Sequence, residues 1–216
     1  MPQRTDSVAS QIAATLAERI VSGELPPGAP LRQDRVADEF GASHVPAREA
    51  FQMLRAQGLA VSELRRGMRV APLDATSIRE VVEMRAALEP LAFRYAVPHM
   101  TLAQIAKIEK ALQAGEEAST IFAWEAANRD FHKALVEPCR MLRLLATLEQ
   151  LRLANSRIVL AVVRSTSWQP QSNHDHRHIV DAIRRKDFER AVGLLKTHIH
   201  GRERPNGVIS VDARIE

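Results

Sequence analysis

The stretch QDRVADEFGASHVPAREAFQMLRAQGL, residues 33–59, decides the fold of the first part of this chain. Its apolar residues recur at helical spacing on both sides of a break at Gly41-Ala42-Ser43, which predicts two helices that meet at a tight turn. The small residues Ala37, Gly41 and Ala47 fall where such helices cross closely. This spacing is typical of a helix-turn-helix, although taken alone it also fits a simple αα-hairpin.

The residues before this stretch predict one more helix and a connector. Residues 7–22 carry apolar side chains at helical spacing, and Gly23 follows where a left-handed residue ends a helix. Residues 24–30 contain Pro26, Pro27, Gly28 and Pro30, which cannot continue a helix. We interpret them as a rigid connector.

The residues after this stretch predict a β-hairpin wing. Gly58 ends the second helix, and residues 59–71 read as two short strands, LAVSEL and MRVA, around Arg65-Arg66-Gly67. Pro72-Leu73-Asp74 then breaks the pattern. We therefore place a domain boundary near residue 73.

The composition favours a mainly α-helical protein of the cytoplasm. Aromatic residues make up only 4% of the 216 residues, while hydrophobic residues make up 45%. The single Cys139 cannot form an intrachain disulfide, and the polar start MPQRTDSVASQ lacks the apolar run of a secretory signal. No apolar stretch approaches the roughly 20 residues of a membrane span, so we expect no membrane insertion.

The net charge of +4 is too small to identify a nucleic-acid binder, but its distribution is informative. Residues 44–70 hold five arginines against two glutamates. At the start of a second helix of this kind, side chains reach base edges and phosphates. Arg48 can form paired hydrogen bonds to a guanine or neutralise a phosphate, and Arg66 with Gly67 can enter a neighbouring minor groove.

The chain is helical in period from about Thr76 to Gly201, with helices expected near 75–97, 102–117, 119–137, 141–165, 172–185 and 187–200. Asn128 and His132 are four apart on one helix face. His176 and His198 each lie eleven residues from Asp187, so a hairpin turning there brings both to one end.

Three imidazoles and one oxygen donor are a usual site for a divalent transition metal such as Zn or Ni. The alternative for each histidine is a surface or hydrogen-bonded residue. We assign that role to His174, His178 and His200.

Residues 12–74 resemble the DNA-binding domain of the GntR family of bacterial regulators. The run from Ile20 to Gly28, the Gly41 turn, the Pro46–Phe51 segment, Gly58-Leu59 and Arg66-Gly67 carry the resemblance. It implies that Ser43, His44, Arg48, Arg66 and Gly67 lie against DNA, with a dimer bound to a near-palindromic operator. The family usually has Arg where His44 stands, and an imidazole lacks the guanidinium fork, so the operator sequence stays open. A solvent-facing role for His44 is the alternative.

Residues 77–201 resemble the FCD class of GntR sensor domains, in which an Asp or Asn precedes Phe-His and two further histidines follow. The matching residues are Asn128, Phe131-His132, His176 and His198. The resemblance implies that Asn128 and the three histidines bind a divalent metal (Zn, with Ni or Mn as alternatives), and that a small carboxylate effector binds at or beside it. The neutral Asn128 is a weaker ligand than Asp.

The segment from Glu83 to Glu89 also resembles the opening of that domain. There Arg85 can pair with an effector carboxylate, or alternatively with Glu89 four residues on.

We therefore expect a mainly α protein with a winged helix-turn-helix domain over 1–73, an all-helical metal- and effector-binding sensor domain over 74–201, and an irregular tail over 202–216. The expected function is that of a homodimeric, ligand-responsive transcription regulator, most simply a repressor. A metal-dependent hydrolase and a constitutive DNA binder are the alternatives. No HExxH, phosphate loop or Ser/His/Asp grouping supports the hydrolase.

Overall fold

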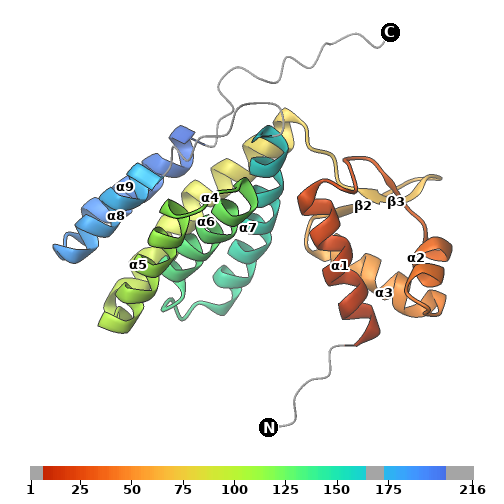
Figure 1. Cartoon of the computed structure of the whole chain (residues 1–216), viewed down its shortest axis with the longest axis horizontal. Coiled ribbons are helices and arrows are strands. Elements are labelled where there is room, and N and C mark those ends of the chain that lie inside the picture. Colours follow the sequence, from red (N-terminus) through yellow and green to blue (C-terminus); the bar gives the residue numbers. More distant parts are fainter. Residues whose placement is uncertain (1–6, 164–172, 203–216) are drawn as a thin grey trace. The chain divides into compact units, whose positions relative to one another are not determined.

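The computed structural model describes residues 7–163 and 173–202 of the chain (Figure 1). The chain divides into two compact units between Asp74 and Ala75, one residue from the boundary placed at 73. We call them the N-terminal unit and the C-terminal unit. Within the described residues, no helix is both long and apolar enough to cross a membrane.

Helix α1 (Val8–Ser22) opens the N-terminal unit and is capped at both ends, with Gly23 ending it as the sequence predicts. The Ser7 hydroxyl accepts a hydrogen bond from the backbone N–H of Ser10, at 3.2 Å. Gly23 has a φ of 74° and donates its backbone N–H to the carbonyl of Ile20. The apolar stripe of α1 is buried and packs on α3.

The helix-turn-helix consists of α2 (Gln33–Glu39) and α3 (His44–Ala56), as predicted. Gly41 takes a φ of 58°, which few residues other than glycine adopt. The backbone N–H of Ala42 then bonds to the carbonyl of Ala37 at 2.9 Å and closes the turn. Ala47 is completely buried, so its small side chain lets α3 pack closely in the interior of the unit.

The wing belongs to a sheet of three strands rather than the two expected. Strands β2 (Ala60–Glu63) and β3 (Gly67–Val70) pair antiparallel, and β1 (Pro30–Leu31) pairs with the other edge of β3. The predicted connector therefore ends in a short edge strand. Pro30 has no N–H to donate, so a sheet tolerates it only at such an edge. Its pairing partner lies some forty residues away, where local periodicity gives no signal.

The C-terminal unit is all-helical in the part that the structure describes. Its elements are α4 (Ala75–Ala96), the 3-10 turn η1 (Val97–His99), α5 (Leu102–Glu116), α6 (Ile121–Val136), α7 (Leu142–Val163), α8 (Asn173–Arg184) and α9 (Phe188–Arg202). Helix α4 packs on α7 and α9, α5 packs on α6 and α8, and α8 lies beside α9. These bounds agree with the predicted helices to within two residues wherever the chain is described. Residues 164, 165 and 172, and all of the expected tail after Arg202, lie outside the described residues.

The α8–α9 hairpin turns where the sequence predicts, at Lys186-Asp187. Lys186 has a φ of 59°, and the backbone N–H of Asp187 bonds to the carbonyl of Ala182 at 2.9 Å. The Asp187 carboxylate accepts from the backbone N–H of Arg190 at the start of α9. These contacts reverse the chain within the three residues between α8 and α9, so the two helices run antiparallel.

Candidate DNA-contacting surface and candidate metal centre

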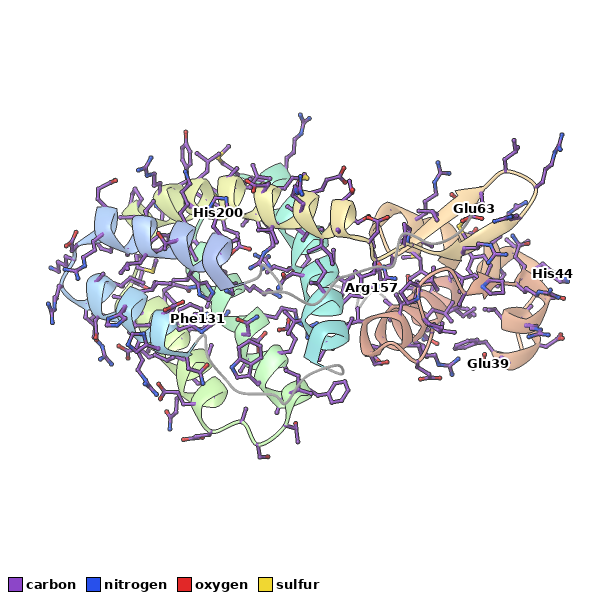
Figure 2. All side chains as sticks on the ribbon, turned by 90° about the horizontal axis from the view of Figure 1, so that it is seen from above. Glu39, His44, Glu63, Phe131, Arg157 and His200 are labelled. Carbon is purple, nitrogen blue, oxygen red and sulfur yellow. The ribbon has the colours of Figure 1, made fainter. Side chains whose placement is uncertain are left out.

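Helix α3 presents its first turn outward while its other face is buried. Ser43 precedes the helix without capping it through its side chain, and Ser43, His44 and Arg48 are exposed. Figure 2 shows His44 projecting from the surface of the N-terminal unit. Ala47 and Phe51, on the opposite face, anchor the helix in the core. The geometry therefore leaves the predicted base-contacting side chains accessible to a partner.

The tip of the wing is exposed and basic. Arg65 and Gly67 have positive φ values of 63° and 77°, which tighten the turn between β2 and β3. Arg66 stands at this tip with a loose ion pair to Glu63, at 3.7 Å. An ion pair between such exposed side chains contributes little, so the guanidinium of Arg66 remains available for a phosphate or a groove.

Three imidazoles from three helices converge in the interior of the C-terminal unit. They belong to His132 on α6, His176 on α8 and His198 on α9, and each is at most 4% exposed. The Nε2 atom of His198 lies 3.2 Å from that of His176 and 3.3 Å from that of His132. Ligand atoms of all three lie within 4.8 Å of one another.

This geometry fits a divalent metal ion. Two nitrogens that each bind zinc at about 2.0–2.1 Å in a tetrahedral site are roughly 3.3 Å apart. The two separations measured from Nε2 of His198, 3.2 and 3.3 Å, match that value. Asn128, one turn before His132 on α6, is also buried and would supply the oxygen donor.

Neighbouring side chains hold each imidazole in place. The ring of His176 stacks on Phe131, with centroids 4.1 Å apart. Asn173 ties the start of α8 to α5 and α6, because its amide donates to the Gly115 carbonyl and accepts from the Trp124 indole N–H, both at 2.9 Å. Asp175 lies 3.2 Å from Nδ1 of His198. The contact of Asp175 is on the side of the His198 ring opposite Nε2, so it directs that Nε2 atom inward.

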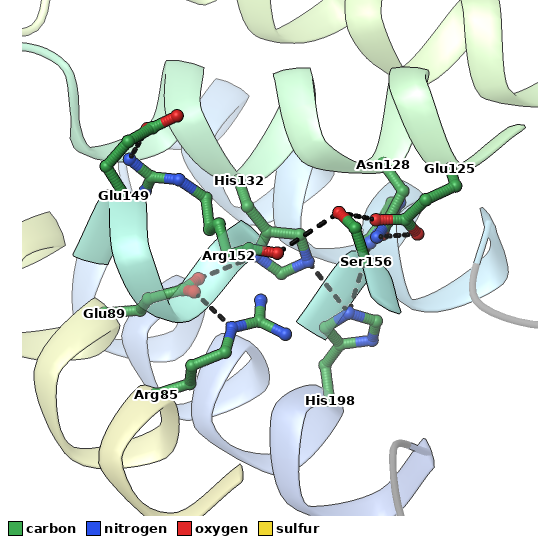
Figure 3. Close-up of polar contacts among 10 residues, drawn as sticks. Arg85, Glu89, Glu125, Asn128, His132, Glu149, Arg152, Ser156 and His198 are labelled. Carbon is green, nitrogen blue, oxygen red and sulfur yellow. Dashed lines mark hydrogen bonds and ion pairs between the residues drawn. The ribbon is translucent and has the colours of Figure 1, made fainter. Parts of the chain in front are cut away.

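A buried row of charges supports His132 (Figure 3). The Glu89 carboxylate lies 2.8 Å from Nδ1 of His132 and accepts from Nε of Arg85 at 2.7 Å. Burial raises the pKa of Glu89, but the charge of Arg85 and the hydrogen bonds to Arg85 and His132 outweigh it, so its pKa lies below the ordinary value. Burial lowers the pKa of His132, although the charge of Glu89 and its hydrogen bond to the ring act to raise it. A neutral imidazole that donates Nδ1–H to Glu89 leaves the Nε2 lone pair for a metal.

A second buried carboxylate, Glu125, lies on the same face of α6. It accepts from the Asn128 amide at 3.0 Å and from the Ser156 hydroxyl of α7 at 2.6 Å. On α7, Arg152 is 4% exposed and donates to Glu149. Among the described residues, its Nε and Nη1 have no hydrogen-bond partner. The interior of this unit is therefore rich in buried charge around α6 and α7.

Comparison with known proteins identifies the family. Residues 8–70 match the model of the bacterial regulatory proteins of the gntR family, and residues 80–201, more than half of the chain, match the FCD domain. The chain belongs to the GntR family. It is a DNA-binding transcription regulator rather than an enzyme, as predicted, and the hydrolase alternative is set aside.

Two curated relatives and one solved structure illustrate the match. The chain is 32% identical over 195 residues to the "Probable D-xylose utilization operon transcriptional repressor" of Paenarthrobacter nicotinovorans, covering 89% of this chain and 86% of the relative. It is 29% identical over 210 residues to the galactonate operon transcriptional repressor of Escherichia coli (strain K12), covering 84% of this chain and 89% of the relative. A GntR transcriptional regulator from Rhodococcus sp. RHA1 shares the fold with a TM-score of 0.76 at 23% identity, and the match covers 90% of this chain and 95% of that structure.

In this GntR protein the structure brings together the three predicted histidines and leaves the others apart. His174 and His178 lie exposed on α8, 3.1 Å from each other, and His200 lies beside Glu83. Arg85 takes the alternative partner that the sequence allowed, Glu89. That ion pair brings its guanidinium close enough to influence the pKa of His132.

Sequence reasoning missed the carboxylates around the three histidines, namely Glu89, Glu125 and Asp175. The spacing of Glu125 three residues before Asn128 was a signal for the second of these. Glu89 was considered only as a partner of Arg85. Its contact with His132 joins residues 43 positions apart, and no spacing rule predicts it.

Proposed function

We propose that this GntR regulator is a homodimeric repressor whose affinity for operator DNA is modulated by a small carboxylate bound at or beside a divalent metal in the FCD domain. The observation that carries the proposal is the convergence of His132, His176 and His198, buried, with Nε2 atoms at metal-ligand spacing. Three imidazoles and one oxygen donor are a usual ligand set for a divalent transition metal.

The three imidazoles and the Asn128 oxygen would hold the metal, with zinc the best fit and nickel or manganese the alternatives. When bound, the metal would supply a positive Lewis-acidic centre with a position open to an anion. All four protein ligands are uncharged, so a carboxylate is the ligand that best balances the charge. Glu89 would hold His132 in the tautomer that binds metal.

The effector class follows from the charge of the site. Arg85 is 1% exposed and its Nε donates to Glu89, which in turn contacts His132, so a buried cation lies near the proposed metal and favours an anionic effector. Of the two relatives, one is named for the operon of a hydroxylated carboxylate, galactonate, and the other for that of a neutral sugar, D-xylose, so the class rests on the charge of the site. We therefore propose a small carboxylate, and the two relatives named as repressors favour repression.

The output would be the placement of two recognition helices. In a dimer, each α3 would enter the major groove from Ser43 onward, with the two half-sites roughly 34–36 Å apart. The effector can change DNA affinity only by its differential affinity for the two arrangements of the dimer.

Two sets of substitutions test the two halves of the proposal separately. Arg48→Ala should weaken operator binding by about 1–3 kcal/mol and leave the metal content unchanged. Arg55→Ala is the matched control, because it removes the same charge from the exposed end of the same helix. His132→Ala with His198→Ala should strip the metal and abolish the effector response while DNA binding persists.

Fluorescence anisotropy with operator DNA, metal analysis, and melting curves with a panel of organic acids are the measurements. Equal loss of DNA binding in the Arg55 and Arg48 variants would contradict the assignment of α3. DNA binding unaffected by every acid in the panel would favour the constitutive alternative.

A further inference from the structure

Glu125, Asn128 and His132 form one buried stripe on α6. Their spacing of three and four residues places them on the same helix face. The side chain of Glu125 is 4% exposed and that of Asn128 6%. Removing a carboxylate from water is costly unless it is hydrogen-bonded, and Glu125 accepts hydrogen bonds from Asn128 and Ser156.

The contacts of Glu125 fix the direction of the Asn128 amide. The Asn128 Nδ2 donates to Oε2 of Glu125 at 3.0 Å, and the Ser156 hydroxyl holds the other oxygen, Oε1, at 2.6 Å (Figure 3). Only the nitrogen of an amide can donate, so the carboxylate selects which end of Asn128 faces it. The Oδ1 atom diverges from Nδ2 and is thereby turned away from Glu125, and His132 is the next residue on that side of the stripe.

The position of Glu125 also addresses the charge that Asn128 lacks. Three neutral imidazoles and an amide would leave a divalent cation without a negative ligand. Glu125 stands one hydrogen bond behind the amide, so its charge would act on the cation through Asn128.

We propose that Glu125 is a positioning residue of the metal centre, one that presents Oδ1 of Asn128 as a ligand and supplies the negative charge an aspartate would have brought. The inference rests on the proposed function, since it requires the metal centre. It makes a specific claim about this chain: the carboxylate and the amide are a coupled pair, and exchanging their chemical types together is tolerated better than changing the amide alone.

The coupling predicts an asymmetric result for aspartate at position 128. Asn128→Asp alone puts a carboxylate in the place of the donor, 3.0 Å from Oε2 of Glu125. Like charges that close and that buried repel, so the metal-free protein should melt at a lower temperature than wild type. Adding Glu125→Gln restores a donor facing an acceptor, so the double variant should recover the melting temperature.

Zinc affinity is the second measurement, made by competition with a chromophoric chelator on the full-length, metal-free protein. Glu125→Gln retains an acceptor oxygen for Asn128 but loses the charge, and it should lower zinc affinity at least about tenfold. The double variant, with the charge moved to position 128, should recover that affinity. Asp130→Asn is the matched control, because Asp130 is exposed on the same helix, and it should change neither quantity.

The outcomes separate this inference from the proposed function. If the wild-type protein binds no more zinc than the His132→Ala variant, the metal centre itself is overturned. Zinc binding that is normal in wild type and unchanged in Glu125→Gln would overturn the role of Glu125 and leave the metal centre standing. The role of Glu125 would also be overturned if the Asn128→Asp variant binds zinc more tightly than wild type and its metal-free form melts no lower. Cobalt absorption spectra, which respond to the number and geometry of the ligands, should show four-coordinate binding in both wild type and the double variant, and loss of it in the double variant would overturn the coupling.

Discussion

The carboxylate of Glu89 lies 2.8 Å from Nδ1 of His132, and both side chains are completely or almost completely buried. Glu89 also accepts from Arg85, so a single carboxylate links a guanidinium of the same helix to an imidazole of another. This link couples the orientation of a candidate metal ligand to the packing of α4 on α6.

Glu89→Gln should therefore impair both metal binding and stability. Loss of the carboxylate leaves Arg85 buried with a weaker partner, which should cost about 3–5 kcal/mol of unfolding free energy. The less firmly held His132 should lower metal affinity about 10- to 100-fold. Urea unfolding and chelator competition measure the two effects. Glu83→Gln, at an exposed position of the same helix, is the control, and matching losses in that variant would count against the role of Glu89.

His44→Arg should change which operator sequence the protein prefers. The side chain is exposed at the first position of α3, where an arginine can form paired hydrogen bonds to a guanine that an imidazole cannot. Selection from a random DNA library should show guanine enriched at one position in each half-site. His44→Ala should lose preference at that position without gaining guanine. An unchanged consensus in both variants would mean that His44 faces solvent in the complex.

Gly41→Ala and Gly193→Ala should shift stability in opposite directions. Gly41 has a φ of 58° in the turn between α2 and α3, so a Cβ there should cost roughly 1 kcal/mol. Gly193 lies exposed within α9, with no atom within 4 Å of an added Cβ, so alanine should contribute about 0.5–1 kcal/mol. Differential scanning calorimetry of the two variants measures both changes. A stabilising Gly41→Ala would show that the turn differs from the one described.

Acid should reduce the stability that Glu137 contributes. Hydrogen bonds from Lys107 and Gln104 lower the pKa of Glu137 below its ordinary value. Because the folded pKa is the lower one, the contribution is complete above the ordinary value and disappears as pH falls through the folded value. Glu137→Gln should cost less than about 1 kcal/mol at neutral pH, since these groups are partly exposed.

The difference in unfolding free energy between wild type and Glu137→Gln should shrink below about pH 4.5. Urea unfolding at several pH values measures it. Glu80→Gln, at an exposed position of α4, serves as the reference for a general charge effect. A difference that stays constant down to pH 3 would contradict the assignment.

The sequence by itself determined the elements and much of their order. Helical periodicity, the Gly41 turn and the helix-ending Gly23 are local signals, because they depend on residues within one or two turns of one another. The equal spacing of His176 and His198 about Asp187 was also readable, since a tight hairpin converts equal spacing into proximity. The short strand at Pro30–Leu31 was not predicted, because it carries no local signal and exists only through its pairing with the distant β3.

Only the tertiary structure decided which charged groups surround the imidazoles. The chain has 26 acidic residues, and nothing in their spacing distinguishes Glu89 as the one that reaches His132. That choice depends on how α4 packs against its neighbours, and packing is the sum of many weak contacts spread over whole helices. Periodicity determines which face of a helix is buried, whereas the side chain it meets there is determined by the helix packed against it.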